Sequence, residues 1–159
     1  MTDARQSDIA HGTFTVERRY DAAPRRVFRA FSDRDVKQRW MGCETVAAPV
    51  IESLDFRIGG REVSRGGDGA GAEHLFEGTY LDIVPDCRFV FAFVMHVGER
   101  KLSASIASVE VVPDGPGARL IFTEQGVYFG EDGWAEREEG TAVGLDQLGA
   151  WLASETETA

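Results

Sequence analysis

Apolar and polar residues alternate along several stretches of this chain, most clearly in RFVFAFVMH at residues 88–96. Phe89, Phe91, Phe93 and Met95 occupy every second position of that stretch. Side chains along a β-strand point alternately to the two faces of a sheet, so the alternation predicts a strand with one bulky, mostly aromatic face. Such a face either fills a solid core or lines a chamber.

The same alternation predicts an antiparallel sheet that takes up most of the chain. Residues 13–22 alternate as a first strand, and turn signals at residues 59–60, 85–86 and 98–99 separate the apolar runs between residues 51 and 129. These runs predict about six further strands. Because consecutive strands joined by tight turns pair antiparallel, we expect a meander rather than a parallel sheet.

Three segments have helical spacing instead of alternation. Residues 24–33 begin at a proline, which suits a first helical turn, and residues 32–42 predict a second short helix with Trp40 on its apolar face. Residues 134–154 predict one long helix with an acidic outer face. Its apolar stripe consists of Trp134, Thr141, Leu145, Leu148 and Leu152. We therefore predict an α+β fold in which the last helix covers one face of a curved antiparallel sheet.

Length and charge limit the domain organisation and the partners. The 159 residues suffice for one domain, which we assign to residues 12–154, and the polar residues 1–11 are interpreted as a disordered leader. The net charge of −10 disfavours nucleic acid and anionic membranes as partners. No apolar run approaches the roughly 18 residues that span a bilayer, so membrane insertion is not expected. The first residues lack the apolar centre of a signal peptide, so we expect a cytoplasmic location.

Cysteine and histidine residues give no sign of a metal centre. Cys43 and Cys87 have neither the number nor the spacing of a disulfide framework or a zinc site. His11 belongs to the predicted leader, and His74 and His96 are interpreted as solvated or structural side chains. We therefore expect no metal and no cofactor.

The order of the motifs resembles the START/Bet v1-like, or SRPBCC, superfamily over about residues 12–153. Residues 14–42 resemble its opening, through Ala23, Pro24, Val27, Phe28, Asp33 and Trp40. Residues 76–93 resemble its strand–proline–strand hairpin. Residues 118–126, followed by residues 136–152, are similar to the branch named after the C-terminal domain of the Hsp90 ATPase activator.

This resemblance implies a helix-grip fold, in which the curved sheet wraps the C-terminal helix and leaves a cavity between them. Relatives in the superfamily bind lipids, sterols, polyketides or plant hormones in that cavity, and some cyclise or hydrolyse what they bind. The eukaryotic chaperone activators carry an additional N-terminal domain that grips Hsp90. The printed sequence shows no such domain, so an Hsp90-type chaperone is not an expected partner.

In such a fold the aromatic row of residues 88–96 faces the helix, and a helix that offers mostly Leu and Thr between glycines does not fill the space opposite it. We therefore favour a chamber over a solid core. The side chains predicted to line it are Trp40, Phe76, Tyr80, Phe89, Phe91, Phe93, Met95, Phe122, Glu124, Trp134, Thr141, Leu145 and Leu148.

Glu124 is the candidate for chemistry, because it alternates with Leu120 and Phe122 and should point inward. An inward carboxylate could hydrogen-bond a ligand hydroxyl or act as a general acid or base. The alternatives are a structural pair with Arg18 or another arginine, or a position in water at the chamber mouth. Arg137 and Glu138 lie near the helix stripe and could add polar contacts.

Three functions follow, in order of preference. The first is a binding protein for a small apolar or aromatic ligand, which needs only apolar walls and one or two polar anchors. The second is a cyclase- or hydrolase-like enzyme that uses the same chamber. The third is a chaperone-cofactor or other protein-interaction role, which needs an exposed patch instead. Edge strands and a partly apolar surface also predict a homodimer.

Overall fold

The computed structural model describes residues 8–41, 49–67, 73–130 and 134–155. Cys43 and residues 1–7 of the predicted leader lie outside these ranges. The elements, in chain order, are β1 (Ile9–Tyr20), α1 (Pro24–Ser32), α2 (Arg34–Met41), β2 (Val50–Leu54), β3 (Arg61–Gly67), β4 (Glu73–Val84), β5 (Arg88–Val97), β6 (Arg100–Asp114), β7 (Gly117–Phe129) and α3 (Trp134–Ser154).

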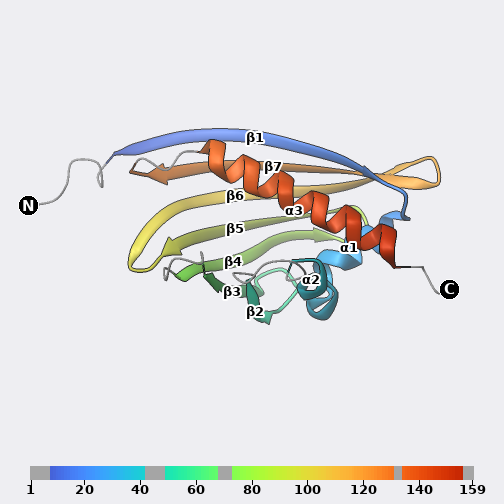
Figure 1. Cartoon of the computed structure of the whole chain (residues 1–159), viewed down its shortest axis with the longest axis horizontal. Coiled ribbons are helices and arrows are strands. Elements are labelled where there is room, and N and C mark those ends of the chain that lie inside the picture. The colour runs from blue at the N-terminus through green and yellow to red at the C-terminus, as the bar shows by residue number, and fades with distance from the viewer. Residues whose placement is uncertain (1–7, 42–48, 68–72, 131–133, 156–159) are drawn as a thin grey trace, which may run out of the picture.

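The strands form a single curved, antiparallel, seven-stranded sheet in the order β1-β7-β6-β5-β4-β3-β2. Consecutive strands from β2 to β7 pair with each other, and β1 returns to pair with β7. Figure 1 shows α3 lying diagonally across one face of this sheet, with α1 and α2 near its C-terminal end. The predicted α+β helix-grip fold is therefore confirmed.

The first strand begins earlier than the sequence suggested. Ile9, Ala10 and His11 fall within the predicted leader, but they pair with Phe129, Tyr128 and Val127 of β7. Ile9, Ala10 and His11 show no clear alternation of apolar and polar residues, so only the pairing with β7 reveals that they belong to the strand.

Local sequence explains where the two short helices begin. Pro24 stands in the first turn of α1, where its missing N–H is not needed. Asp33 caps α2, because its Oδ1 accepts hydrogen bonds from the backbone N–H groups of Asp35 (3.0 Å) and Val36 (3.2 Å). The described helices are all too short or too polar to span a bilayer.

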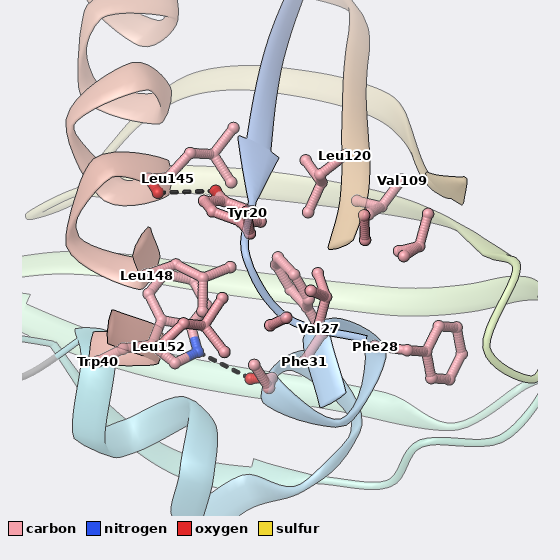
Figure 2. Close-up of a cluster of buried hydrophobic side chains, with 14 of the residues drawn as sticks. Tyr20, Val27, Phe28, Phe31, Trp40, Val109, Leu120, Leu145, Leu148 and Leu152 are labelled. Carbon is pink, nitrogen blue, oxygen red and sulfur yellow. Dashed lines mark hydrogen bonds between the residues drawn. The ribbon is translucent and has the colours of Figure 1, made fainter. Parts of the chain in front are cut away.

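The solid part of the core lies at the end of the sheet where α1 meets α3 (Figure 2). Buried side chains from α1, α3 and the strands fill it: Val27, Phe28, Phe31, Val109, Leu120, Leu145, Leu148 and Leu152. Two hydrogen bonds tie the elements together there. The Tyr20 hydroxyl donates to the Leu145 carbonyl (2.7 Å), and the Trp40 indole N–H donates to the Ala30 carbonyl (2.8 Å).

Candidate functional site

A pocket of about 640 Å³ lies between α3 and the inner face of the sheet. The inward positions of β3, β4, β5, β6 and β7 form its floor, and side chains of α1, α2 and α3 complete its walls. Its aromatic lining residues are Phe31, Trp40, Phe76, Tyr80, Phe89, Phe91, Phe93 and Phe122.

The aromatic row of β5 takes part in both the core and the pocket. Phe89 is 2 % exposed and packs edge-on against Phe28 of α1, with ring centroids 5.9 Å apart. Phe91 and Phe93 continue the row along the pocket floor, with ring centroids 5.4 Å apart. Met95 also lines the pocket. The row therefore changes from core to wall along the strand.

Most of the residues predicted to line a chamber do border this pocket: Trp40, Phe76, Tyr80, Phe89, Phe91, Phe93, Met95, Phe122, Glu124, Thr141 and Leu145. Leu148 does not, because it is fully buried in the core one turn beyond Leu145. Trp134 does not either, because the first residue of α3 packs its ring on Gly12 of β1, where a Cβ atom would lie only 2.5 Å from the ring. The pocket therefore spans only the middle of the helix stripe.

Two glycines of α3 leave room beside the pocket. Gly140 and Gly144 both border it, and a Cβ atom built on either would meet nothing within 4 Å. Gly149 differs, because its Cβ would lie 3.1 Å from the Tyr20 ring. The absence of side chains at residues 140 and 144 therefore contributes directly to the open volume.

Glu124 is buried, with 1 % of its surface exposed, and points inward as predicted. Its Oε2 accepts hydrogen bonds from Ser105 Oγ (2.9 Å), Tyr128 OH (2.7 Å) and Arg137 Nη1 (3.0 Å). The suggested pairing with Arg18 is wrong, since Arg18 Nε donates to Asp146 Oδ1 on α3 (2.7 Å), whereas the alternative of a pair with another arginine describes the Glu124–Arg137 contact.

Arg137 is held by several groups besides Glu124. Its Nη2 donates to Ser103 Oγ (2.6 Å), and its guanidinium carbon lies 5.5 Å from the ring centroids of both Phe93 and Tyr128. Burial raises the pKa of Tyr128 above its ordinary value, and its hydrogen bond to Glu124 adds to the shift. Glu138, which was also expected near the helix stripe, is exposed and does not border the pocket.

A second ion pair, which the sequence pattern did not indicate, borders the same pocket on the inner face of the sheet, across the strands from Glu124. Glu62 of β3 is 3 % exposed and contacts Lys37 Nζ of α2 through both oxygens (2.7 and 2.8 Å). Tyr80 OH donates to Glu62 Oε1 (2.6 Å), and Ser64 Oγ lies 3.5 Å from Oε2. Burial, followed by the nearby Glu62 charge, raises the pKa of Tyr80 far above its ordinary value.

The histidines and the described cysteine lie in different surroundings. His74 borders the pocket, opposite Gly66 in the β3–β4 register. His96 does not border it, and its buried Nδ1 has no hydrogen-bond partner. Cys87 is exposed. In the described ranges, no three His, Cys, Asp or Glu side chains gather closely enough to hold a metal ion.

A curved antiparallel sheet gripping a C-terminal helix, with a pocket between them, defines the class of helix-grip proteins. Residues 21–154 match the family described as Activator of Hsp90 ATPase homolog 1-like protein, and the chain belongs to that family. No curated protein sequence gave a significant match.

Solved structures of the same fold come from several bacteria. The Mll3558 protein of Rhizobium loti is 44 % identical, with a TM-score of 0.81 over 90 % of this chain and 98 % of that one. An uncharacterised Rhizobium leguminosarum protein is 36 % identical, with a TM-score of 0.87 over 93 % and 98 % of the two chains. CalU16 of Micromonospora echinospora is 21 % identical and shares the fold (TM-score 0.64; 91 % and 85 %).

Proposed function

We propose that this chain binds a small, largely apolar, aromatic ligand in the pocket between the sheet and α3. The observation that carries the proposal is the volume of about 640 Å³ bordered by phenyl rings and by two glycines with open space beside them. Ligand pockets typically enclose about 300–1,000 Å³, with apolar walls and a few placed polar groups. The charged groups that border it include the Glu124–Arg137 and Glu62–Lys37 pairs.

A neutral fluorescent dye such as N-phenyl-1-naphthylamine tests this proposal. We expect saturable binding at about one site per chain, because the rings offer one continuous apolar surface. Gly144→Leu should weaken dye binding about tenfold or more, since the new side chain would enter the open space. Replacing a helical glycine gains up to about 1 kcal/mol of helix propensity, so this variant should remain folded.

Gly144→Ala is the matched control, because it has the same gain in propensity but adds only one methyl group. It should bind the dye nearly as the unmodified chain does. Undiminished dye binding by folded Gly144→Leu would contradict the proposal.

A second candidate is a cyclase- or hydrolase-like enzyme that uses the same pocket. The supporting observation is that all three hydrogen bonds to Glu124 reach Oε2, while none from the described residues reaches Oε1. A carboxylate oxygen that borders a pocket without a protein partner is able to accept a substrate proton. We rank this function second, because a single available oxygen also suffices for a ligand anchor.

A further inference from the structure

The floor of the pocket carries a buried ion pair at each end and apolar groups between them. Glu62 stands in register with Gly78 of β4, Phe93 of β5 and Ser105 of β6. Glu124 stands in the neighbouring inward row, which contains Ala107, Phe91 and Tyr80. A path from one glutamate to the other therefore crosses two phenyl rings and two small residues.

The two ion pairs lie far apart. Glu124 is on β7 and Glu62 is on β3, with β6, β5 and β4 between them. Neighbouring strands are about 4.8 Å apart, so the separation across the strands is roughly 19 Å along the curved sheet. The straight distance across the concave inner face is shorter than this path, but a ligand that reaches both pairs lies over the Phe91 and Phe93 rings, which favours an elongated aromatic shape.

The Glu124 end offers a hydrogen-bond acceptor. Its Oε2 is occupied by Ser105, Tyr128 and Arg137, and no described residue donates to Oε1. Glu124 borders the pocket, so Oε1 is the oxygen that a ligand donor can reach. A hydroxyl group matches this acceptor.

The Lys37 end offers a hydrogen-bond donor. An ammonium group has three N–H donors, and Glu62 lies within hydrogen-bond distance of Nζ through two oxygens. The Lys37 side chain is 12 % exposed and borders the pocket, which leaves the third donor for a ligand acceptor. Both Glu62 oxygens already have donors of their own, so this end does not need a ligand donor.

The charges around Lys37 favour a neutral ligand acceptor over an anionic one. Each pair is neutral as a whole, since Glu62 offsets Lys37 and Glu124 offsets Arg137. A ligand carboxylate beside Lys37 would lie close to the buried Glu62 carboxylate, and burial strengthens that repulsion. A carbonyl oxygen accepts the same hydrogen bond without the repulsion.

We propose that the pocket binds a neutral, elongated aromatic ligand in one orientation, with a ligand hydroxyl at the Glu124 end and a ligand carbonyl at the Lys37 end. This inference rests on the proposed function, because it names the ligand class for the same pocket. It adds the orientation of the ligand and the role of Lys37, the one lysine of the chain besides Lys101.

A series of trans-stilbene probes tests the proposal. The five probes are unsubstituted stilbene and its 4-hydroxy, 4′-acetyl, 4-hydroxy-4′-acetyl and 4-hydroxy-4′-carboxylate derivatives, titrated by fluorescence. Each hydrogen bond to a charged group should raise the affinity about tenfold to a hundredfold, and the two gains should multiply in the doubly substituted probe. The carboxylate should bind no better than the 4-hydroxy probe.

Paired variants locate each gain. Lys37→Met/Glu62→Gln removes both charges of one pair and should abolish only the acetyl gain, whereas Glu124→Met/Arg137→Met should abolish only the hydroxyl gain. Lys101→Met is the control for the first variant, because Lys101 is exposed and does not border the pocket. The probe series with the unmodified chain tests the proposal even where a paired variant does not fold.

The outcomes separate this inference from the function on which it rests. The proposed orientation is wrong, while the proposed binding function stands, if three results occur together. Unsubstituted stilbene binds, Gly144→Leu abolishes that binding, and the hydroxyl and acetyl groups do not raise the affinity. A 4-hydroxy-4′-carboxylate probe that binds better than the 4-hydroxy probe, or gains that survive in both paired variants, would also overturn the orientation. If no probe binds at all, both proposals fail.

Discussion

At the scale of single residues, Glu124 shows how a buried charge is accommodated. Ser105, Tyr128 and Arg137 all donate to Oε2, and the guanidinium lies over two aromatic rings. A charge that is both paired and hydrogen-bonded can remain in an apolar pocket, whereas removing one partner leaves the other uncompensated. Glu124 and Arg137 should therefore behave as a unit.

Glu124→Gln should lower the free energy of unfolding by roughly 1–3 kcal/mol, because Arg137 would lose its counter-charge in a mostly buried position. Arg137→Met should be destabilising for the converse reason. The double variant should be less destabilised than the sum of the two single effects, by about 0.5–3 kcal/mol. Urea denaturation of the four proteins measures this coupling.

Glu138→Gln is the matched control, since Glu138 is exposed on the same helix and does not border the pocket. It should change the free energy of unfolding by no more than about 0.5 kcal/mol. Strictly additive effects of the Glu124 and Arg137 substitutions would contradict the proposed pairing.

The same Glu124→Gln variant separates the two candidate functions. A ligand anchor should lose roughly 1–3 kcal/mol of affinity for a hydroxylated ligand, because the acceptor is no longer charged. A general acid or base should instead keep its affinity and lose about 100-fold or more in turnover. Isothermal titration with the 4-hydroxystilbene probe, alongside turnover assays with cyclisable or hydrolysable aromatic substrates, distinguishes them.

At the scale of elements, β5 passes from the core to the pocket along its length. Both Phe89 and Phe91 border the pocket, but Phe89 is 2 % exposed and packs against Phe28 and Phe31 of α1, whereas Phe91 is only partly buried. A ring that faces open volume makes fewer dispersion contacts than one that is surrounded. The two positions should therefore respond differently to the same truncation.

Phe89→Ala should cost about 3–5 kcal/mol in the free energy of unfolding, as for a ring removed from a packed core. Phe91→Ala should cost less, roughly 1–2 kcal/mol, because part of the Phe91 ring already borders a cavity. Chemical denaturation of both variants provides the comparison. Equal costs at the two positions would mean that the row forms one solid core.

The glycines of α3 provide a second test at this scale. Gly140→Ala should raise the free energy of unfolding by up to about 1 kcal/mol, because the new methyl group meets no neighbour and helix propensity improves. Gly149→Ala should gain less, since its Cβ would lie 3.1 Å from the Tyr20 ring. Thermal melts of the two variants check the order, and a larger gain at Gly149 would contradict the described packing of α3.

At the scale of the whole molecule, the fold could be predicted because its signals are local and repeated. The alternation in β5 and the spacing of Leu145, Leu148 and Leu152 each require only a few neighbouring residues. The first three residues of β1 lack such a local pattern, because Ile9 to His11 owe their strand conformation to pairing with β7.

The site could be predicted only in part. Alternation shows which residues of a strand share a face, but it does not show which face lies toward the inside. Glu62 and Ser64 alternate with Val63, and polar residues on such a strand are normally assigned to the solvent side. The pairing of Glu62 with Gly78 places it on the inner face, and the packing of α2 supplies Lys37 as its partner. Both facts depend on long-range contacts.

The tyrosines provide a test at this scale. Burial raises the pKa of each of the chain's three tyrosines, Tyr20, Tyr80 and Tyr128. Their contribution to stability is complete below the unfolded-state pKa of about 10. Above that pH the unfolded chain releases protons that the folded chain retains, so the free energy of unfolding should fall by up to about 1.4 kcal/mol per pH unit for each tyrosine.

Phenolate absorbance and circular dichroism, followed together from pH 8 to strongly alkaline solution, check this prediction. Ionisation should appear only as the chain unfolds, and Tyr80→Phe should make the loss of stability with pH less steep. Phenolate formation near pH 10 in a chain that keeps its native circular dichroism would contradict the burial of these side chains.

The most direct test of ligand binding in the pocket is a nuclear Overhauser measurement on the methyl-labelled chain with the bound naphthylamine dye. Met95 borders the pocket, whereas Ile106 is on the outer face of the neighbouring strand and is 42 % exposed. Dye protons should show contacts to the Met95 methyl group and to the rings of Phe91 and Phe93, but none to Ile106. Contacts to Ile106 without contacts to Met95 would place the dye on the outside of the sheet and contradict binding between the sheet and α3.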